Sequence, residues 1–436
     1  MIAAQRTSLS GVGLLHGPVH SSVAASRLIL AGCVGNALEW YDFAVYGYFA
    51  AVIGHNFFPA QDPTVALIAA FGVFAAAFLA RPIGAVIFGH IGDRYGRKPA
   101  LVISVAAMAV ATTLMGLLPT YAEVGAVAPV LLIVLRLIQG LSVGGEHATS
   151  CVFLVESSRP GRRGLFGSFA VAAVTVGMLL GSAIGAIVAS YTTQPELLAW
   201  GWRIPFLLGI VLGTMALYLR QSVIAEAKTT RASHGLPIAQ AFRSDWSGLL
   251  RGFVMTMTPA VGFYLTFMYL ISYMQRVDGL TLSTSLRINT FSMVVMLILT
   301  PAAGWLSDRV GRRVVLGGAL ITTLLLVWPL FQMLGSKEVA AIALGQAGLA
   351  TLFGIYGGAY PAALVEMFAP TIRCSATSLS LNLGMGLLGG TAPMVAVYLV
   401  SRAHIGMGPV YYLMAVVALS LIAVITWRRA PEWIGA

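Results

Sequence analysis

The chain has 436 residues, of which 58% are hydrophobic and 9% are charged, and its 26 Lys and Arg residues against 15 Asp and Glu give a formal net charge of +11. Because roughly a quarter of the residues in soluble domains are charged, this composition excludes an ordinary soluble protein and indicates an integral membrane protein. The excess of basic residues suits a belt that faces anionic lipid, and it gives little support to nucleic-acid binding.

Apolar stretches long enough to cross a bilayer recur along the whole chain. A spanning helix needs roughly 20 apolar residues, whereas a spanning strand would be shorter and would alternate in polarity. The sequence therefore predicts an all-α membrane protein. Its twelve expected spans are residues 28–53, 65–90, 99–118, 127–155, 164–190, 200–220, 249–273, 286–305, 314–334, 340–365, 374–400 and 408–427.

The polar segments predict how the spans are organised. Most Lys and Arg residues fall in the loops on one side, which predicts that both termini are cytoplasmic. No signal peptide is expected at the N-terminus. The expected units are a cytoplasmic tail at 1–27, a six-helix bundle at 28–220, a cytoplasmic linker at 221–248, a second six-helix bundle at 249–427 and a cytoplasmic tail at 428–436.

Three acidic residues fall within the predicted spans, namely Glu39, Asp42 and Glu146. Ionisable groups inside a membrane are costly unless they face partners or water, so they mark functional sites by default. Glu39 and Asp42 are three residues apart and can share one helix face. We expect the three acids to couple transport to protons. The alternative is a structural role in capping or packing.

Arg136 is the leading candidate to bind a substrate in the N-terminal half. Its guanidinium can offer a planar pair of donors to a carboxylate, which a lysine cannot match. Gln139 follows three residues later on the same expected face. The alternative is a permanent ion pair of Arg136 with Glu39 or Asp42. Arg81, before Pro82, is either a structural residue or part of an inner gate.

One ten-residue pattern, G-x-x-x-D-R-x-G-R-[K/R], occurs at residues 89–98 and again at 304–313. A second pattern, Leu-Val-Glu followed by Pro and Arg, occurs near Glu156 and near Glu366. Two shared blocks in the same order indicate a duplication of two equivalent halves. We expect these residues to form a cytoplasmic gate, with the alternative that the basic ones only anchor the topology. The gate candidates are Asp93, Arg94, Arg97, Glu156, Asp308, Arg309, Arg312 and Glu366.

The spans also carry polar aromatic and amide side chains that could bind a substrate through neutral hydrogen bonds. For any one of them, packing is the alternative. Cys33, Cys151 and Cys374 lack metal-ligand spacing, and no phosphate-binding loop occurs. We therefore expect no metal, no cofactor and no catalytic residue, with a gradient as the energy source. The further binding candidates are Tyr46, Tyr264, Tyr356, Tyr360 and Asn382.

Several strings resemble a known family. The duplicated loop pattern is similar to the signature of the major facilitator superfamily, and residues 35–43 (GNALEWYDF), 81–84 (RPIG), 136–146 (RLIQGLSVGGE) and 201–206 (GWRIPF) resemble its metabolite:proton symporters. His147 departs from the family, which has a Tyr or a similar residue there.

The resemblance implies the major facilitator fold and alternating access. It implies proton symport of a small organic acid in the bacterial inner membrane, by a monomer that contacts lipid and no nucleic acid. Uptake of a zwitterion such as proline or betaine is the alternative, and a receptor that does not transport is another.

Overall fold

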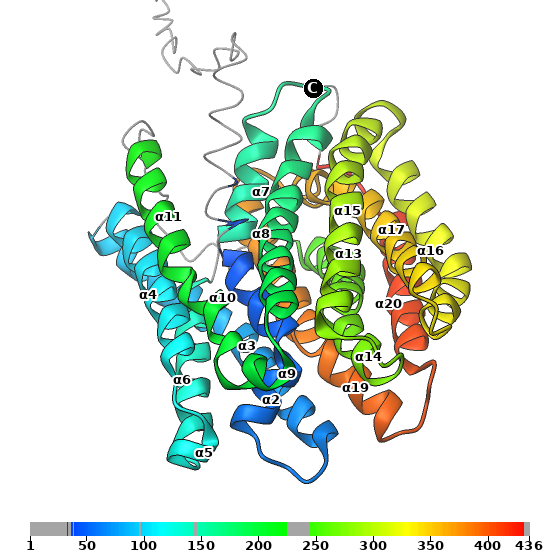
Figure 1. The fold of residues 1–436 in the computed structure, drawn as a ribbon. Coiled ribbons are helices and arrows are strands. Elements are labelled where there is room, and N and C mark those ends of the chain that lie inside the picture. Colours follow the sequence, from blue (N-terminus) through cyan, green and yellow to red (C-terminus); the bar gives the residue numbers. More distant parts are fainter. Residues whose placement is uncertain are drawn as a thin grey trace, which may run out of the picture.

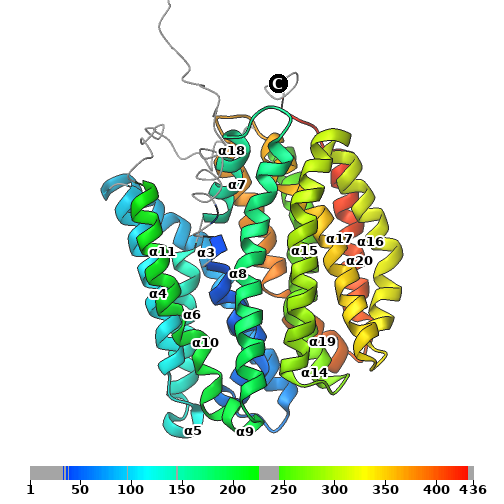
Figure 2. The ribbon, with the colours of Figure 1, turned by 45° about the horizontal axis from the view of Figure 1, so that its top comes forward.

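The structure is a computed structural model that describes residues 33, 36–37, 39–95, 97–143, 146–224 and 245–430. All regular structure in these ranges is helical, and the helices lie side by side in one bundle (Figures 1 and 2). Ten of the described helices are long and apolar enough to cross a membrane, and a shorter apolar helix covers Val102–Leu117. The expected first span lies partly outside the described ranges, but residues 39–48 are helical. The chain is thus an all-α, multi-pass membrane protein, as predicted.

The N-terminal half packs its helices around the segment 39–48. In this half α2 and α6 both pack on α3, and α10 and α11 pack on α4. The elements are α2 (Ala50–Phe57), α3 (Pro63–Tyr95), α4 (Arg97–Leu117), α5 (Tyr121–Val124), α6 (Val127–Ser142), α7 (Glu146–Glu156), α8 (Arg163–Tyr191), α9 (Gln194–Glu196), the π-helix η1 (Leu197–Gly201), α10 (Arg203–Leu207) and α11 (Gly209–Ile224).

The C-terminal half is likewise a bundle of packed helices. Here α17 packs between α15 and α16, and α20 packs on α13 and α16. The elements are α13 (Trp246–Tyr264), the π-helix η2 (Leu265–Tyr269), α14 (Leu270–Arg276), α15 (Leu282–Val310), α16 (Arg312–Leu334), α17 (Val339–Glu366), α18 (Arg373–Leu383), the π-helix η3 (Gly384–Gly389), α19 (Ala392–Ser401) and α20 (Gly408–Ile425).

Local chemistry explains where several helices begin and end. The Asp245 side chain accepts from the Gly248 amide at 2.8 Å and caps the start of α13, and Thr281 caps α15 through the Thr284 amide. Such caps satisfy backbone donors that have no partner within the helix. Gly311 separates α15 from α16 with a φ of 97°. Only glycine adopts this conformation without strain, so the loop pattern needs a glycine at this position.

The observed helices extend further than the apolar stretches. The eighth span was expected to end at residue 305, but α15 continues through the charged residues to Val310. Likewise, α11 reaches Ile224 and α13 begins at Trp246, both inside the expected linker 221–248. A helix satisfies its backbone internally in water as well as in lipid, so hydropathy marks the membrane and not the helix end. Residues 225–244, the expected tail 1–27 and residues 431–436 of the expected tail 428–436 lie outside the described residues.

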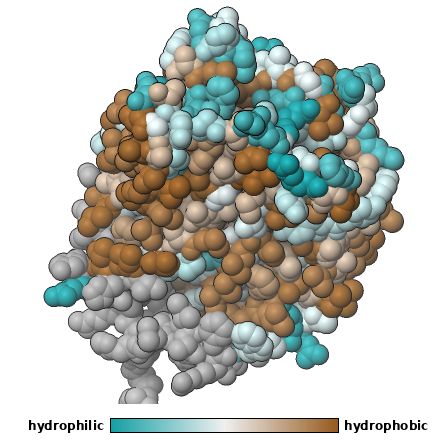
Figure 3. Space-filling model, turned by 90° about the horizontal axis from the view of Figure 1, so that it is seen from below, coloured by the Kyte–Doolittle hydropathy of each residue, from teal (hydrophilic) through white to brown (hydrophobic). Residues whose placement is uncertain are grey.

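The two halves meet along α8 and α15, which run side by side in both views (Figures 1 and 2). At one end of the bundle α18 packs on α7, and towards the other end α19 packs on α3. We call the end that holds Arg312 and Glu366 the predicted inner end, and the end that holds Asp62 and Arg402 the predicted outer end. Seen from below Figure 1, the bundle shows hydrophobic residues over much of its outline and hydrophilic residues gathered on part of the face (Figure 3).

Candidate functional site

A cluster of buried aromatic rings lies between the two halves. Ring centroids are 4.8 Å apart for Phe43 and Phe78, 5.4 Å for Phe78 and Tyr264, and 6.1 Å for Trp40 and Tyr264. Tyr264 belongs to α13 and the other rings belong to the N-terminal half, so these aromatic residues join the halves. We define the central cluster as Trp40, Phe43, Phe74, Phe78 and Tyr264, all of them fully buried.

Arg81 places a positive charge against this cluster. Its guanidinium carbon lies 4.1 Å from the ring centroid of Phe78 and 4.6 Å from that of Phe43. Its Nη2 is 3.3 Å from Oε1 of Glu39. Arg81 Nε is buried without a hydrogen-bond partner among the described residues. The aromatic faces and the Glu39 carboxylate therefore surround one cation, as in sites that bind ammonium groups.

Arg136 is a second fully buried cation, 4.0 Å from the centroid of Tyr46. Its Nη1 donates to Gln139 Oε1 at 2.7 Å, and Gln139 Nε2 in turn donates to Thr112 Oγ1 at 2.6 Å. The two candidate ligands thus share a helix face, as expected. Nε and Nη2 of Arg136 have no hydrogen-bond partner within the described parts of the chain. Unpaired buried N–H groups are costly, so they are suited to receive a ligand.

The two acids of the first span, Glu39 and Asp42, lie near different arginines. Glu39 pairs with Arg81, whereas Asp42 lies near Thr112 and within electrostatic range of Arg136. Arg81 and not Arg136 is therefore the ion-pair partner of Glu39 that the geometry shows. Two guanidinium groups and two carboxylates, if all are ionised, give the centre a formal charge of zero. Glu146, the third acid, is the partly exposed first residue of α7.

Of the other binding candidates, Tyr264 is part of the central cluster and the rest have hydrogen-bond partners of their own. The Tyr46 hydroxyl donates to the Ala70 carbonyl, and the Tyr264 hydroxyl has no hydrogen-bond partner in the described ranges. Tyr356 and Tyr360 stack on each other at 5.8 Å and bond to the Met255 carbonyl and to Thr256. Asn382 bonds to Ser378 within α18. The roles of all these residues in binding stay predictions.

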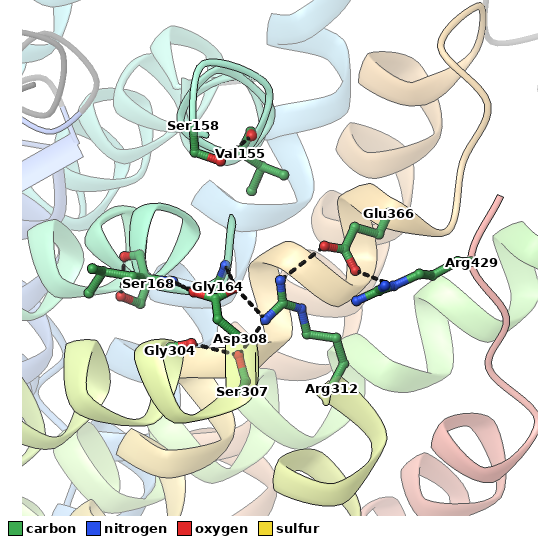
Figure 4. Close-up of polar contacts among 11 residues, drawn as sticks. Val155, Ser158, Gly164, Ser168, Gly304, Ser307, Asp308, Arg312, Glu366 and Arg429 are labelled. Atoms are coloured by element: carbon green, nitrogen blue, oxygen red, sulfur yellow. Dashed lines mark hydrogen bonds and ion pairs between the residues drawn. The ribbon is translucent and has the colours of Figure 1, made fainter. Parts of the chain in front are cut away.

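The second copy of the loop pattern forms a polar network at the predicted inner end (Figure 4). Asp308 accepts from the amides of Gly164 at 2.7 Å and Leu165 at 2.9 Å, at the start of α8. Arg312 contacts Asp308 at 2.8 Å and Glu366 at 3.0 Å. A helix N-terminus attracts an anion, so Asp308 connects the C-terminal half to the N-terminal half.

Three more contacts extend this network. Glu156 pairs with Arg373 at 2.5 Å across the two halves, and Arg429 pairs with Glu366 at 3.0 Å. Arg309 lies over the Trp305 ring of its own helix. In the first copy of the pattern Arg94 is exposed, and the side chains of Asp93 and Arg97 lie outside the described residues. Gating by these residues stays a prediction.

Sequence reasoning named Tyr264 but missed the other four rings of the central cluster, and it assigned Arg81 no role at the centre. A spacing signal existed, because Phe74, Phe78 and Arg81 follow one another at four and three residues and so share a face of α3. Phenylalanines in an apolar helix usually indicate packing, which hid this signal. Among the residues that the structure describes, no group of His, Cys, Asp or Glu could hold a metal ion.

Comparisons with known proteins agree with this architecture. Residues 28–224 and 219–435 match the model of the family described as sugar (and other) transporters. The proline/betaine transporter of Salmonella typhimurium is 33% identical over 424 residues, which cover 93% of this chain and 84% of that protein. The glycine betaine/proline/ectoine/pipecolic acid transporter OusA of Dickeya dadantii is 33% identical over 412 residues, with 91% and 82% covered.

Solved structures share the fold at lower sequence identity. A D-xylose-proton symporter superposes with a TM-score of 0.72 at 19% identity, over 94% of this chain and 99% of that one. The partially occluded inward-open form of the xylose transporter XylE from E. coli gives a TM-score of 0.70 at 18% identity, over 92% and 96%.

Proposed function

The chain belongs to the sugar (and other) transporter family of the major facilitator superfamily, and from this premise we propose that it takes up a small zwitterion, of the proline or betaine type, together with protons. It is a membrane transporter and not an enzyme. The similar transporters favour this zwitterion over the organic acid that the sequence alone favours, since their names give proline, betaine and related solutes as what they transport.

One observation carries the proposal: two buried guanidinium groups and two buried carboxylates surround the central cluster. A zwitterion adds no net charge to this neutral centre, whereas a dianion would add two negative charges in a medium of low dielectric constant. The free Nε and Nη2 of Arg136 suit the carboxylate of the solute. Its ammonium group would take the place that Arg81 occupies over Phe78 and beside Glu39.

Proton coupling follows from the same groups. A solute carboxylate on Arg136 competes with Asp42 for that positive charge. Asp42 then favours a proton, because an ionised acid in a buried site needs a nearby cation. Solute and proton would therefore bind together at the centre, and both would leave when the other end opens.

Uptake into proteoliposomes tests the proposal. We expect wild-type protein to accumulate glycine betaine or proline when the outside is acidic, and to lose accumulation when the proton gradient is collapsed. Asp42→Asn should impair accumulation more than exchange without a gradient, because exchange requires binding but no net movement of protons. Accumulation of citrate or 2-oxoglutarate with no uptake of either zwitterion would refute the choice of solute, and uptake that ignores the gradient would refute the coupling.

A further inference from the structure

A pocket lies between the halves, towards the predicted outer end. Its volume is about 110 Å³, and it is partly open to the surface. Leu67 of α3 forms the wall from the N-terminal half, and residues of η2, α14 and α19, together with Val277 after the end of α14, form the rest. The lining residues are Leu67, Tyr269, Ser272, Tyr273, Arg276, Val277, Val397, Val400 and Ser401.

The pocket has one polar side and one apolar side. Ser272 is 2% exposed, and its hydroxyl has no hydrogen-bond partner in the described parts of the chain. Arg276 lies at the rim, and no carboxylate is found among the residues that line this pocket, all of which the structure describes. Leu67, Val397 and Val400 supply the apolar wall. An unpaired hydroxyl and a cation suit an anionic group attached to a small apolar body. The Asp62 carboxylate lies within electrostatic range of Arg276 but is not part of the lining.

Arg276 also contributes to the contact between the halves. Its Nη2 donates to Thr64 Oγ1 at 2.6 Å, and Thr64 belongs to α3. A carboxylate in the pocket would compete with Thr64 for this guanidinium, because a charged acceptor binds it more strongly than a hydroxyl. Binding would therefore weaken one of the contacts that join the halves at the predicted outer end.

The pocket and the central cluster share one continuous helical segment. Ser272 follows Tyr264 by eight residues, which corresponds to about 12 Å at 1.5 Å per residue. The π-helix η2 lies between them, and such turns are frequent at functional sites. The pocket is thus a separate place on the path from the predicted outer surface to the centre.

We propose that this pocket is an entry site that binds the carboxylate of a small solute through Arg276 and Ser272 before the outer end opens. This inference rests on the proposed function only for the identity of the solute, since its chemical requirement is a carboxylate on a small body.

Protection of a cysteine in the pocket tests this inference without relying on transport. Ser401→Cys places a thiol in the pocket lining, in a background with Cys33 and Cys374 replaced by serine; Cys151 is buried. We expect glycine betaine, proline or acetate to slow labelling by a neutral maleimide about tenfold at saturation. Choline, which has the ammonium group of betaine without its carboxylate, should not. Equal protection by choline, or no protection by any of the three carboxylates, would overturn the proposal.

Two arginines provide a matched comparison. Arg287 also donates from the C-terminal half to a hydroxyl of the N-terminal half, Ser190, but it does not line the pocket. Arg276→Gln should raise the half-protecting concentration about tenfold, a typical effect of a charge-assisted hydrogen bond, and Arg287→Gln should leave it unchanged. Similar shifts in both variants would mean that closure of the outer end and not carboxylate binding is measured, which would also overturn the proposal.

A variant at the centre separates this inference from the proposed function. In Arg136→Gln, uptake should fall while carboxylates still protect the pocket thiol. Loss of protection in that variant would place the carboxylate at the centre alone and so contradict an entry site. If the wild type takes up neither betaine nor proline yet acetate protects Ser401→Cys through Arg276, the proposed solute fails and the entry site stands.

Discussion

At the scale of the residue, Arg136 combines a fixed orientation with two unused donors. Its Nη1 is held by Gln139 and its plane lies on Tyr46, while Nε and Nη2 have no partner among the described residues. Lysine would keep the charge but lose the paired donors. Arg136→Lys should therefore weaken glycine betaine binding about tenfold, roughly 1.4 kcal/mol, with little change in melting temperature. Titration calorimetry measures the first and a melting curve the second. Unchanged affinity would remove Arg136 from the site.

Asp278, in the loop between α14 and α15, gives a prediction on pH. Loss of hydration raises the pKa of its carboxyl to about 6, although Lys337 opposes this. An acid whose pKa is raised by folding destabilises the protein when ionised. This loss of folding stability is absent below the pKa that Asp278 has in the unfolded chain, and it is complete above about pH 6. We expect Asp278→Asn to raise the melting temperature at pH 7.5 and to leave it unchanged near pH 4.

Asp62 is the matched comparison, because folding shifts the pKa of its carboxyl group in the opposite direction. The Thr64 amide, above all, lowers the pKa of this exposed carboxyl. Its stabilising effect is present above the unfolded pKa and disappears as the pH falls through the folded value. Asp62→Asn should therefore lower the melting temperature at pH 7.5. A rise in both variants, or in neither, would contradict this account of the two acids.

At the scale of the element, two glycines set how closely α8 and α15 approach. A Cβ on Gly304 would lie 2.6 Å from the Gly164 carbonyl oxygen and 2.8 Å from Ser168. Because backbone cannot move aside cheaply, Gly304→Ala should separate the halves at the predicted inner end. Labelling of Val171→Cys, which faces α17 near Gly357, should become severalfold faster as that end opens.

Gly317→Ala is the control for this prediction. No atom lies within 4 Å of the added Cβ on α16, and alanine favours a helix by up to about 1 kcal/mol over glycine. The labelling rate should stay at the wild-type value in this variant. The close-approach argument is wrong if Gly304→Ala also leaves the rate unchanged.

The elements also show what the sequence could predict. Long apolar stretches identified the spans that the structure describes, since the membrane requires them at a fixed length. The repeated pattern identified Asp308 and Arg312, because a glycine turn and paired charges leave a clear signal. The ion pair of Arg81 with Glu39 could not be predicted, since it depends on how α3 packs against residues 39–48. The three π-helices in the described part of the chain likewise depend on packing and carry no signal in hydropathy.

At the scale of the whole molecule, ion pairs join the halves at both ends. Glu156–Arg373 lies at the predicted inner end with Arg373 almost buried, and Asp62–Arg402 lies at the predicted outer end with both side chains more than 40% exposed. Removing a pair should favour opening of its own end. Glu156→Gln should therefore speed labelling of Val171→Cys, whereas Asp62→Asn should speed labelling of Ser401→Cys.

The two effects should differ in size. Exposed pairs contribute at most about 1 kcal/mol, whereas a buried arginine that loses its partner costs several. The inner-end variant should thus show the larger change. If both variants opened the same end, the pairs would not act as separate contacts at the two ends of the bundle.

The contact between Glu366 and Arg429 also bears on how the protein is made. Glu366 is fully buried and 63 residues separate it from Arg429. Glu366 is therefore synthesised well before Arg429. In that interval, of the two arginines that pair with Glu366, only Arg312 is present in the growing chain. Trp427, whose indole donates to the Ala363 carbonyl, is also synthesised long after its partner. The inner network of the C-terminal half can thus be complete only after Trp427 and Arg429 have been synthesised, and until then the buried Glu366 carboxylate depends on Arg312 for its counter-charge.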